Sequence, residues 1–263
     1  MKSINVVIHG ASGRVGQVLV NNLYREPALK LVGAVDIKVP ADKLVLGDGS
    51  WIPFSADLEK VLSDTRPDVM VDFSLAQASM PAARTAAKKQ VNLVIGTTGL
   101  TADNLREIET LADSQKICAV VAANFALGAV LMMHFAKLAA KYLDSAEIIE
   151  LHHNLKADAP SGTALSTARV MAAYRGKPFS QAVDEGKNYP SRGQRVEGVA
   201  IHSVRLPGLM AHQEVLFGGP GQTLSIRHDT INRECYIPGV LLAIQEVVRR
   251  RGLIQGLDKL LDL

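Results

Sequence analysis

Side chains that transfer protons or bind anions are concentrated in one stretch of the sequence, HHNLKADAPSGTA, at residues 152–164. Histidine side chains in general titrate near neutral pH, and burial can tune a lysine, so His152, His153 or Lys156 can act as a general acid or base. A shared metal ion is a poor alternative, because adjacent strand residues point to opposite faces and no histidine or cysteine cluster has ligand spacing. We therefore expect proton-transfer chemistry and no metal.

The second half of this stretch predicts a binding site for a carboxylate. Pro160, Ser161, Gly162 and Thr163 lead into a helical segment, and Ser161 suits its N-cap. The amides of Gly162 and Thr163 are then free in the first turn, where the helix dipole also favours an anion. We include Ser161, Gly162 and Thr163 among the substrate-binding residues, beside the positive charge of Lys156.

A glycine-rich turn near the N-terminus predicts a dinucleotide site. The sequence GASGRVG places Gly10, Gly13 and Gly16 between an apolar strand and a helix. Glycines let a pyrophosphate approach the backbone amides at a helix N-terminus, and Arg14 adds positive charge. Ser12 stands where the strict G-x-G-x-x-G pattern has its middle glycine, so a tight turn without a ligand is the alternative.

Two residues at the end of the second predicted strand bear on the choice of dinucleotide, and each favours a different one. Asp36 ends that strand, 20 residues after Gly16. An acidic residue there accepts hydrogen bonds from the adenosine ribose hydroxyls, which favours NAD. Lys38 can pair with a 2′-phosphate, which favours NADP. The choice between NAD and NADP stays open.

The ends of two further strands predict contacts with the nicotinamide or the substrate. Gly96, Thr97 and Thr98 follow one strand, and residues 122–125 follow the next. In doubly wound sheets, ligands bind outside the carboxyl ends of the strands. For each segment taken alone, an ordinary loop is an equally good explanation.

The elements that position these residues change in kind near residue 125. Before it, apolar strands alternate with helices, which predicts an α/β, Rossmann-like domain whose parallel sheet is covered on both faces. The expected strands are 4–10, 29–36, 68–74, 92–98 and 117–125, and the expected helices are 14–26, 79–90 and 101–114.

The second half of the chain predicts a mixed-sheet α+β domain. The expected helices are 127–143 and 162–176, and the expected strands are 147–153, 198–208, 212–218 and 222–229, the last two joined by a hairpin turn. A helix at 238–252, opened by Pro238 and ended by Gly252, returns to the first domain. We therefore assign 1–125 and 238–263 to the dinucleotide-binding domain and 126–237 to a substrate-binding domain.

The composition is that of an ordinary globular protein, with 263 residues, 48% hydrophobic and 21% charged, and a net charge of +3. The one basic run, residues 249–251, suits a helix C-terminus, so we expect no nucleic-acid partner. No apolar run is long enough to span a membrane. Cys118 and Cys235 are scattered and no signal peptide is visible, so we expect a cytoplasmic protein.

Several of these motifs, taken together and in order, resemble those of a known family. The stretch ELHHNLKADAPSGTA, preceded in order by GASGRVG, DFS, IGTTG and AANFALG, is similar to the dihydrodipicolinate reductase family over essentially the whole chain. The resemblance implies NAD(P)H-dependent formation of tetrahydrodipicolinate in diaminopimelate and lysine biosynthesis. It also implies a small dicarboxylate substrate, closure of the two domains over their ligands, and a homotetramer built by the mixed-sheet domain.

The resemblance implies a role for each matching residue. His152 corresponds to the family's proton donor or acceptor, Lys156 to its proton donor, and His153, with Gly162 and Thr163, to contacts with the substrate carboxylates. The residues matching cofactor contacts are Gly10, Ala11, Ser12, Gly13, Arg14, Val15 and Asp36 for the phosphates and ribose, and Gly96, Thr97, Thr98, Ala122, Ala123, Asn124 and Phe125 for the nicotinamide.

The sequence departs from the family at two places near the cofactor. Leu75 follows DFS where some members have a basic residue, and Ile37 follows Asp36 where some have arginine. Two alternatives are another two-domain NAD(P)-dependent dehydrogenase and a non-catalytic NAD-binding sensor. The sequence leaves open the nucleotide, the hydrated or dehydrated state of the substrate ring, the oligomer interface and the role of residues 177–197.

Overall fold

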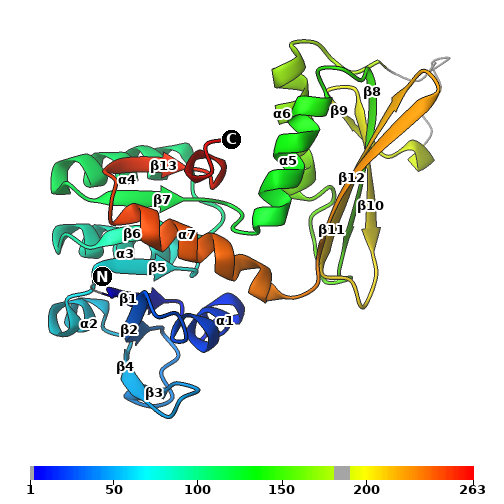
Figure 1. The fold of residues 1–263 in the computed structure, drawn as a ribbon. Helices are drawn as coiled ribbons and strands as arrows, with labels where there is room; N and C mark the ends of the chain where they lie inside the picture. Colours follow the sequence, from blue (N-terminus) through cyan, green and yellow to red (C-terminus); the bar gives the residue numbers. More distant parts are fainter. Residues whose placement is uncertain (1–2, 181–189) are drawn as a thin grey trace. The chain divides into compact units, whose positions relative to one another are not determined.

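The computed structural model describes residues 3–180 and 190–263 (Figure 1). These form two compact units, one of residues 3–127 and 233–263 and one of residues 128–180 and 190–232. The chain therefore leaves the first unit and later returns to it. It returns earlier than the sequence suggests, because the short helix η2 (Arg233–Tyr236) packs against helices of the first unit. Part of the unassigned region 177–197 lies outside the described residues.

The first unit contains an eight-stranded sheet in the order β13-β7-β6-β5-β1-β2-β4-β3. Every pairing is parallel except the one between β3 and β4. The strands are β1 (Ile4–His9), β2 (Leu29–Val35), β3 (Lys43–Val45), β4 (Trp51–Ser55), β5 (Val69–Asp72), β6 (Asn92–Ile95), β7 (Cys118–Val121) and β13 (Gly252–Gln255). Central strands such as β5 and β7 are buried along their whole length, as expected for a sheet covered on both faces.

Helices cover both faces of this sheet (Figure 1). On one face lie α2 (Leu58–Thr65), α3 (Ala76–Lys88) and α4 (Ala102–Gln115), whose apolar side chains form one core with the strands. On the other lie α1 (Arg14–Leu23) and α7 (Ile237–Val247), and η3 (Asp258–Leu260) follows β13. Thr101 caps α4, since its hydroxyl accepts a hydrogen bond from the Asn104 amide. This is a Rossmann-like arrangement.

The strand order reverses at β1, which pairs with β2 on one side and β5 on the other. The connections that follow β1, β5, β6 and β7 therefore emerge at the same carboxyl edge of the sheet. This edge carries all the residues for which the sequence predicts cofactor contacts.

The second unit contains a five-stranded mixed sheet in the order β12-β11-β8-β10-β9, in which only β8 and β10 are parallel. The strands are β8 (Ser145–His152), β9 (Gln194–Val196), β10 (Val199–Arg205), β11 (Ala211–Gly219) and β12 (Gln222–Thr230). The helices are α5 (Leu127–Ala139), α6 (Gly162–Arg175) and η1 (Pro190–Arg192). Alanines and methionine of α5 and α6 pack on one face of the sheet and form the core. The predicted hairpin joins β11 and β12.

Several predicted bounds were wrong. The last helix ends at Val247 rather than at 252, and Gly252, with φ of +78°, begins strand β13 instead of ending the helix. Helix α5 ends at Ala139 rather than at 143. The short elements β3, β4, α2, β9 and β13 were not predicted at all. Among the described residues, no helix is long and apolar enough to cross a membrane.

Candidate active site

The turn between β1 and α1 is built so tightly that two positions require glycine. Gly10 has φ of +82°, and a Cβ there would lie 2.8 Å from the carbonyl oxygen of Phe73. A Cβ on Gly16 would lie 2.0 Å from the carbonyl oxygen of Gly10. The start of α1 is therefore pressed against the turn, which leaves its N-terminal amides exposed beside the carboxyl edge of the sheet.

The amides of this turn divide into two groups. Those of Gly10 and Ala11 donate to the carbonyl oxygen of Val35, at 2.9 and 3.1 Å, and shape the turn. In the part of the chain that the structure describes, the first-turn amides of Arg14 and Val15 have no acceptor. Two free amides at a helix N-terminus suit an anionic group such as a phosphate.

The carboxylate of Asp36 accepts two hydrogen bonds from the protein's own backbone. One oxygen accepts the Ser12 amide at 2.9 Å and the other accepts the Lys38 amide at 3.1 Å. The Ser12 hydroxyl donates to the Lys38 carbonyl oxygen at 2.8 Å, which ties the β2 end to the glycine turn. Each carboxylate oxygen can accept a second hydrogen bond, so Asp36 can still receive ribose hydroxyls. The Lys38 side chain is exposed beside it.

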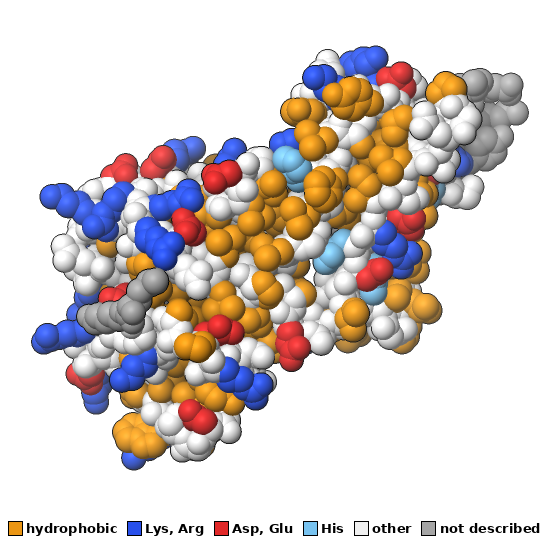
Figure 2. Space-filling view, in the orientation of Figure 1, with side chains coloured by type: hydrophobic (Ala, Val, Ile, Leu, Met, Phe, Trp, Pro, Cys, Tyr) orange, Lys and Arg blue, Asp and Glu red, His pale blue; other side chains and the backbone are white. Residues whose placement is uncertain are grey.

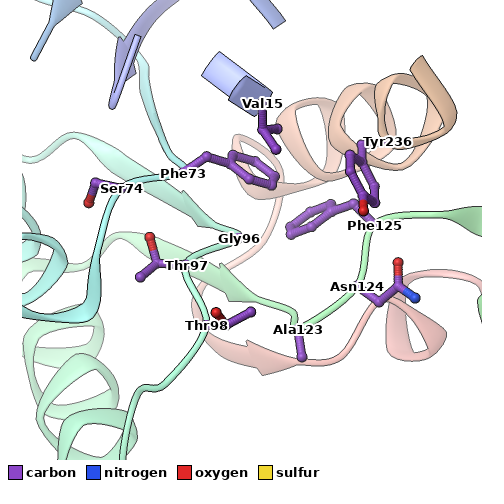
Figure 3. Close-up of a pocket in the computed structure, with 10 residues that line it drawn as sticks. All are labelled: Val15, Phe73, Ser74, Gly96, Thr97, Thr98, Ala123, Asn124, Phe125 and Tyr236. Carbon is purple, nitrogen blue, oxygen red and sulfur yellow. The ribbon is translucent and has the colours of Figure 1, made fainter. Parts of the chain in front are cut away.

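A cavity of about 240 Å³ lies at the carboxyl edge of the sheet (Figure 3). The predicted residues that line it are Val15, Gly96, Thr97, Thr98, Ala123, Asn124 and Phe125, and those that the sequence did not single out are Phe73, Ser74 and Tyr236. Ala122 is absent from the lining, because it is buried and its amide donates to the Ile95 carbonyl oxygen at 3.0 Å.

Aromatic rings shape this cavity (Figure 3). The centroids of Phe73 and Phe125 lie 5.4 Å apart with their planes tilted by 57°. Phe73 packs so closely on Gly96 that a Cβ there would lie 2.2 Å from the ring. Tyr236 reaches the cavity from η2, and burial raises the pKa of its phenol, which keeps it neutral. The result is a slot with aromatic rings on its walls and polar side chains around them, which suits a flat polar ring such as nicotinamide.

A buried carboxylate lies behind the slot. Asp72, at the end of β5, is fully buried and accepts hydrogen bonds from His9 Nδ1 at 2.7 Å and from the Ser74 amide at 3.1 Å. The hydroxyls of Thr97, at 3.0 Å, and of Ser79 also donate to it. Burial alone would raise the pKa of Asp72, but the hydrogen bonds outweigh it and the pKa lies below its usual value. The predicted contact Thr97 therefore turns its hydroxyl inward, toward Asp72.

The second unit holds a buried carboxylate of its own. Glu150, on β8, is fully buried, and His152 Nδ1 lies 2.5 Å from its Oε2. Arg205, on β10, donates to both oxygens at 2.8 and 2.9 Å, and the Ser161 amide donates to Oε1 at 3.2 Å. Burial raises the pKa of Glu150, but the interactions with His152, Arg205 and Ser203 outweigh it and hold the pKa at about 2. Glu150 is thus ionised at neutral pH.

Lys156 lies in the loop between β8 and α6, where its ammonium group pairs with Asp158. The two Nζ–carboxylate distances are 2.7 and 2.9 Å, and the pairing with Lys156 lowers the pKa of Asp158. Arg205 holds the same loop, because its Nη2 donates to the carbonyl oxygen of Asp158 at 2.6 Å. The structure thus connects Lys156 to His152 through Asp158, Arg205 and Glu150.

Helix α6 begins as the sequence predicts. The Ser161 hydroxyl accepts the Ala164 amide at 3.2 Å and caps the helix. Ser161 is buried with both its amide and its hydroxyl engaged, so it orients the helix start. Among the described residues, the amides of Gly162 and Thr163 have no acceptor. His153 Nδ1 is buried and has no partner in the described chain.

Two family models match consecutive parts of the chain. The model described as dihydrodipicolinate reductase, N-terminus, matches residues 4–125, and the model described as dihydrodipicolinate reductase, C-terminus, matches residues 128–261. The chain belongs to the dihydrodipicolinate reductase family. The resemblance that the sequence motifs indicate is therefore confirmed.

Relatives in this family are similar along their whole length. The 4-hydroxy-tetrahydrodipicolinate reductase of Dehalococcoides mccartyi is 56% identical over 100% of both chains. That of Moorella thermoacetica is 47% identical over 99% of this chain and 98% of the relative. Members of this family are NAD(P)H-dependent oxidoreductases, so the chain is an enzyme of that class.

A solved structure agrees with the family. The dipicolinate-bound dihydrodipicolinate reductase from Paenisporosarcina sp. TG-14 is 38% identical, with a TM-score of 0.86, and the match covers 98% of this chain and 99% of that one. An amine dehydrogenase from Mycobacterium smegmatis, at 16% identity and a TM-score of 0.64, shares the fold alone. The predicted fold class is confirmed.

Sequence reasoning missed residues of both candidate sites, which are Asp72, Phe73, Ser74 and Tyr236 in the first unit and Glu150 and Arg205 in the second. Phe73 and Ser74 follow a strand of the same sheet, so the rule that found Gly96 would also have found them. Glu150 precedes His152 by two strand positions, which places both on one face. Tyr236 and Arg205 carry no such signal, because only the folded chain brings them to the site.

Proposed function

We propose that this reductase converts 4-hydroxy-tetrahydrodipicolinate, or the dihydrodipicolinate formed from it, to tetrahydrodipicolinate in diaminopimelate and lysine biosynthesis. The observation that carries the proposal is the fold of residues 150–164. It holds a histidine on a buried carboxylate, a lysine and a helix N-terminus with two free amides in one hydrogen-bonded unit. An anionic substrate that must be protonated needs these three features together.

The residues of the first unit fit a reduced dinucleotide. The free amides of Arg14 and Val15 would bind phosphate, and Asp36 would accept the adenosine ribose hydroxyls. The slot beside Phe73 and Phe125 would take the nicotinamide ring. When bound, the cofactor supplies a hydride to the conjugated ring of the substrate.

Cofactor preference depends on two neighbouring residues. Asp36 keeps acceptor capacity for a free 2′-hydroxyl, while the exposed Lys38 can reach a 2′-phosphate. We therefore propose that the enzyme uses both NADH and NADPH. Dissociation constants for the two nucleotides, measured with D36A and K38A, test this. D36A should weaken NADH binding more than NADPH binding, and K38A should do the reverse.

The residues of the second unit would bind and protonate the dicarboxylate. The free amides of Gly162 and Thr163 would hold one carboxylate, and His153, whose buried Nδ1 has no partner among the described residues, would hold the other. Lys156 would leave Asp158 to contact the substrate, and His152 or Lys156 would donate a proton to the carbon beside the reduced one. Ser161 would contribute by orienting the helix start.

Two alternatives carry less support. A semialdehyde dehydrogenase would need a reactive cysteine beside the nicotinamide slot. Burial raises the pKa of Cys118 to about 11, and neither cysteine lines the slot among the described residues. In a non-catalytic NAD sensor, the hydrogen-bonded arrangement around His152 and Lys156 would have no chemical role.

The direct test is a coupled assay. Freshly generated 4-hydroxy-tetrahydrodipicolinate is supplied to the enzyme, and the absorbance of NADH or NADPH is followed. We expect oxidation of the nucleotide that depends on both substrate and enzyme. No oxidation with either nucleotide, from protein that still binds NADH, would overturn the proposal and favour the sensor.

We also propose a cytoplasmic homotetramer assembled through the second unit. Figure 2 shows hydrophobic side chains gathered over α5, where Leu131, Phe135 and Leu138 are exposed. The edge strand β12 is exposed along most of its length. Exposed apolar side chains and an unpaired strand edge both favour association. Light scattering after size exclusion gives the mass, and F135E should lower it.

A further inference from the structure

The buried carboxylate of Glu150 has no part in the chemistry assigned above, yet four hydrogen bonds converge on it. Its Oε2 accepts from His152 Nδ1 and Arg205 Nη1, and its Oε1 accepts from Arg205 Nη2 and the Ser161 amide. No part of its side chain reaches solvent. Burying a charge is costly, so such a group is retained where its contacts serve a purpose.

The state of Glu150 determines which nitrogen of His152 is free. An ionised carboxylate only accepts hydrogen bonds, so the proton between the two side chains belongs to His152 Nδ1. The exchangeable position is then Nε2, and the imidazole is 14% exposed. When the imidazolium gives its Nε2 proton to the substrate, it becomes neutral, keeps Nδ1–H on Glu150 and regains the proton from solvent.

The same carboxylate is linked to the other groups of the site. Arg205 joins it to the carbonyl oxygen of Asp158, whose side chain holds Lys156. The Ser161 amide joins it to the first turn of α6. Glu150 on β8 is therefore linked by hydrogen bonds both to the residues proposed for proton transfer and to the amides proposed to bind a carboxylate.

We propose that Glu150 is a positioning residue that fixes His152 with Nδ1 protonated and Nε2 free to exchange a proton. The proposal rests on the function proposed above, in which His152 serves proton transfer. Glutamine at this position tests it, because glutamine has nearly the same shape but replaces one acceptor by a donor. With its oxygen toward Ser161, the amide nitrogen faces both Arg205 and the Nδ1–H of His152, and the histidine must change tautomer or rotate.

The chain offers a matched control on the same strand. Glu147 also accepts a histidine, at 2.8 Å from His202 Nε2, and an arginine, Arg192, but it has no bond to the loop that carries Lys156. E150Q and E147Q are compared with wild type in kcat, in the dissociation constant of dipicolinate and in thermal stability. We expect E150Q to lower kcat about 100-fold, the lower range for loss of general acid catalysis, and to change dipicolinate affinity less than about threefold. E147Q should stay within about twofold in both.

A second measurement needs no variant at Glu150. Solid-state NMR of wild-type protein labelled with ¹⁵N-histidine reports the tautomer of His152, whose signal is assigned by its absence in H152N. We expect a protonated Nδ1 at neutral pH, and in folded E150Q a changed tautomer. A wild-type Nδ1 without a proton overturns the proposal, even if E150Q does not fold.

The kinetic measurements on E150Q can also overturn the proposal. A near-normal kcat in E150Q removes the positioning role. Loss of dipicolinate binding equal to the loss of kcat assigns Glu150 to general support of the loop and also overturns the proposal. If wild type has no reductase activity, the proposed function fails, while the NMR result still decides the pairing of Glu150 with His152.

Discussion

Asp72 in the first unit and Glu150 in the second unit have similar surroundings, but their partners suggest different roles. Each is a fully buried carboxylate that accepts a hydrogen bond from Nδ1 of a histidine and a backbone amide from a loop of its unit's candidate site. Their other partners differ. Asp72 is satisfied by the hydroxyls of Thr97 and Ser79, whereas Glu150 is satisfied by the two-pronged contact of Arg205.

The difference in partners indicates a difference in role. Besides His9, the hydroxyls of Thr97 and Ser79 bind Asp72 and tie it to the backbone around the slot proposed for nicotinamide, so we expect changes there to affect cofactor affinity and stability. Besides His152, the guanidinium of Arg205 binds Glu150 and leads through Asp158 to Lys156, so we expect changes there to affect the chemical step. We therefore expect the buried carboxylate to support the shape of a cavity in the first unit and the proposed proton-transfer group in the second.

The largest effect is expected from K156A. Loss of a proton donor should lower kcat by about two orders of magnitude or more, with the dissociation constant of NADH unchanged. Steady-state kinetics and nucleotide binding by fluorescence measure the two. K137A is a matched control, because the Lys137 ammonium stacks over the Tyr174 ring on the same unit. A near-normal kcat in K156A would remove it from proton transfer.

D72N should show the opposite pattern. An amide leaves some donors around this buried position unsatisfied, at a cost of about 1–3 kcal/mol, so NADH should bind about tenfold more weakly and the melting temperature should fall. The value of kcat at saturating NADH should stay within about threefold. D68N is the control, since Asp68 lies just before the other end of β5 and, among the described residues, its carboxylate accepts the Asn5 amide alone. A fall in kcat with unchanged NADH affinity would make the two carboxylates equivalent.

Acid should remove the contribution of both carboxylates. Each has a folded-state pKa below its ordinary value, about 2 against 4.5 for Glu150, so each stabilises the fold above its unfolded pKa and loses this as pH falls toward the folded value. Urea unfolding between pH 5 and pH 2.5 should show a falling midpoint. E150Q and D72N should each flatten this slope, and the double variant should flatten it by the sum, because the two residues have separate partners. A slope that neither variant alters would contradict this.

The smallest effect is expected from S161A. Loss of an N-cap typically costs about 1 kcal/mol, and T101A, the matching cap in the first unit, should cost a similar amount. Denaturant unfolding measures both. Dipicolinate affinity should change less than about twofold in S161A, since its hydroxyl is engaged by Ala164. A tenfold loss would show instead that this hydroxyl is a ligand.

The sequence was most informative where local chemistry decides structure. The positions of Gly10 and Gly16, and the capping of α6 by Ser161, follow from backbone sterics and hydrogen bonding within a few residues. The long apolar strands of the first sheet also follow from pattern alone. By contrast, β4 contains Pro53, and β13 has only two apolar residues, between Gly252 and Gln255, so neither has a pattern that distinguishes it from a loop.

The parts of the site that the sequence missed depend on tertiary register. Arg205 reaches Glu150 because β10 pairs with β8 in a register that sets Arg205 opposite His152. Asp72 meets His9 across the pairing of β5 with β1. Since register is set by the packing of whole sheets, no local pattern reveals these partners.

The return of residues 233–263 to the first unit also sets the order in which the protein can be completed. Tyr236 forms one side of the nicotinamide slot, α7 covers one face of the sheet and β13 closes its edge. A chain emerging from the ribosome therefore makes its first strands early but finishes that unit last, after the whole of the second unit has been synthesised. The slot that we propose for nicotinamide is therefore complete only after residues 233–255 have been synthesised.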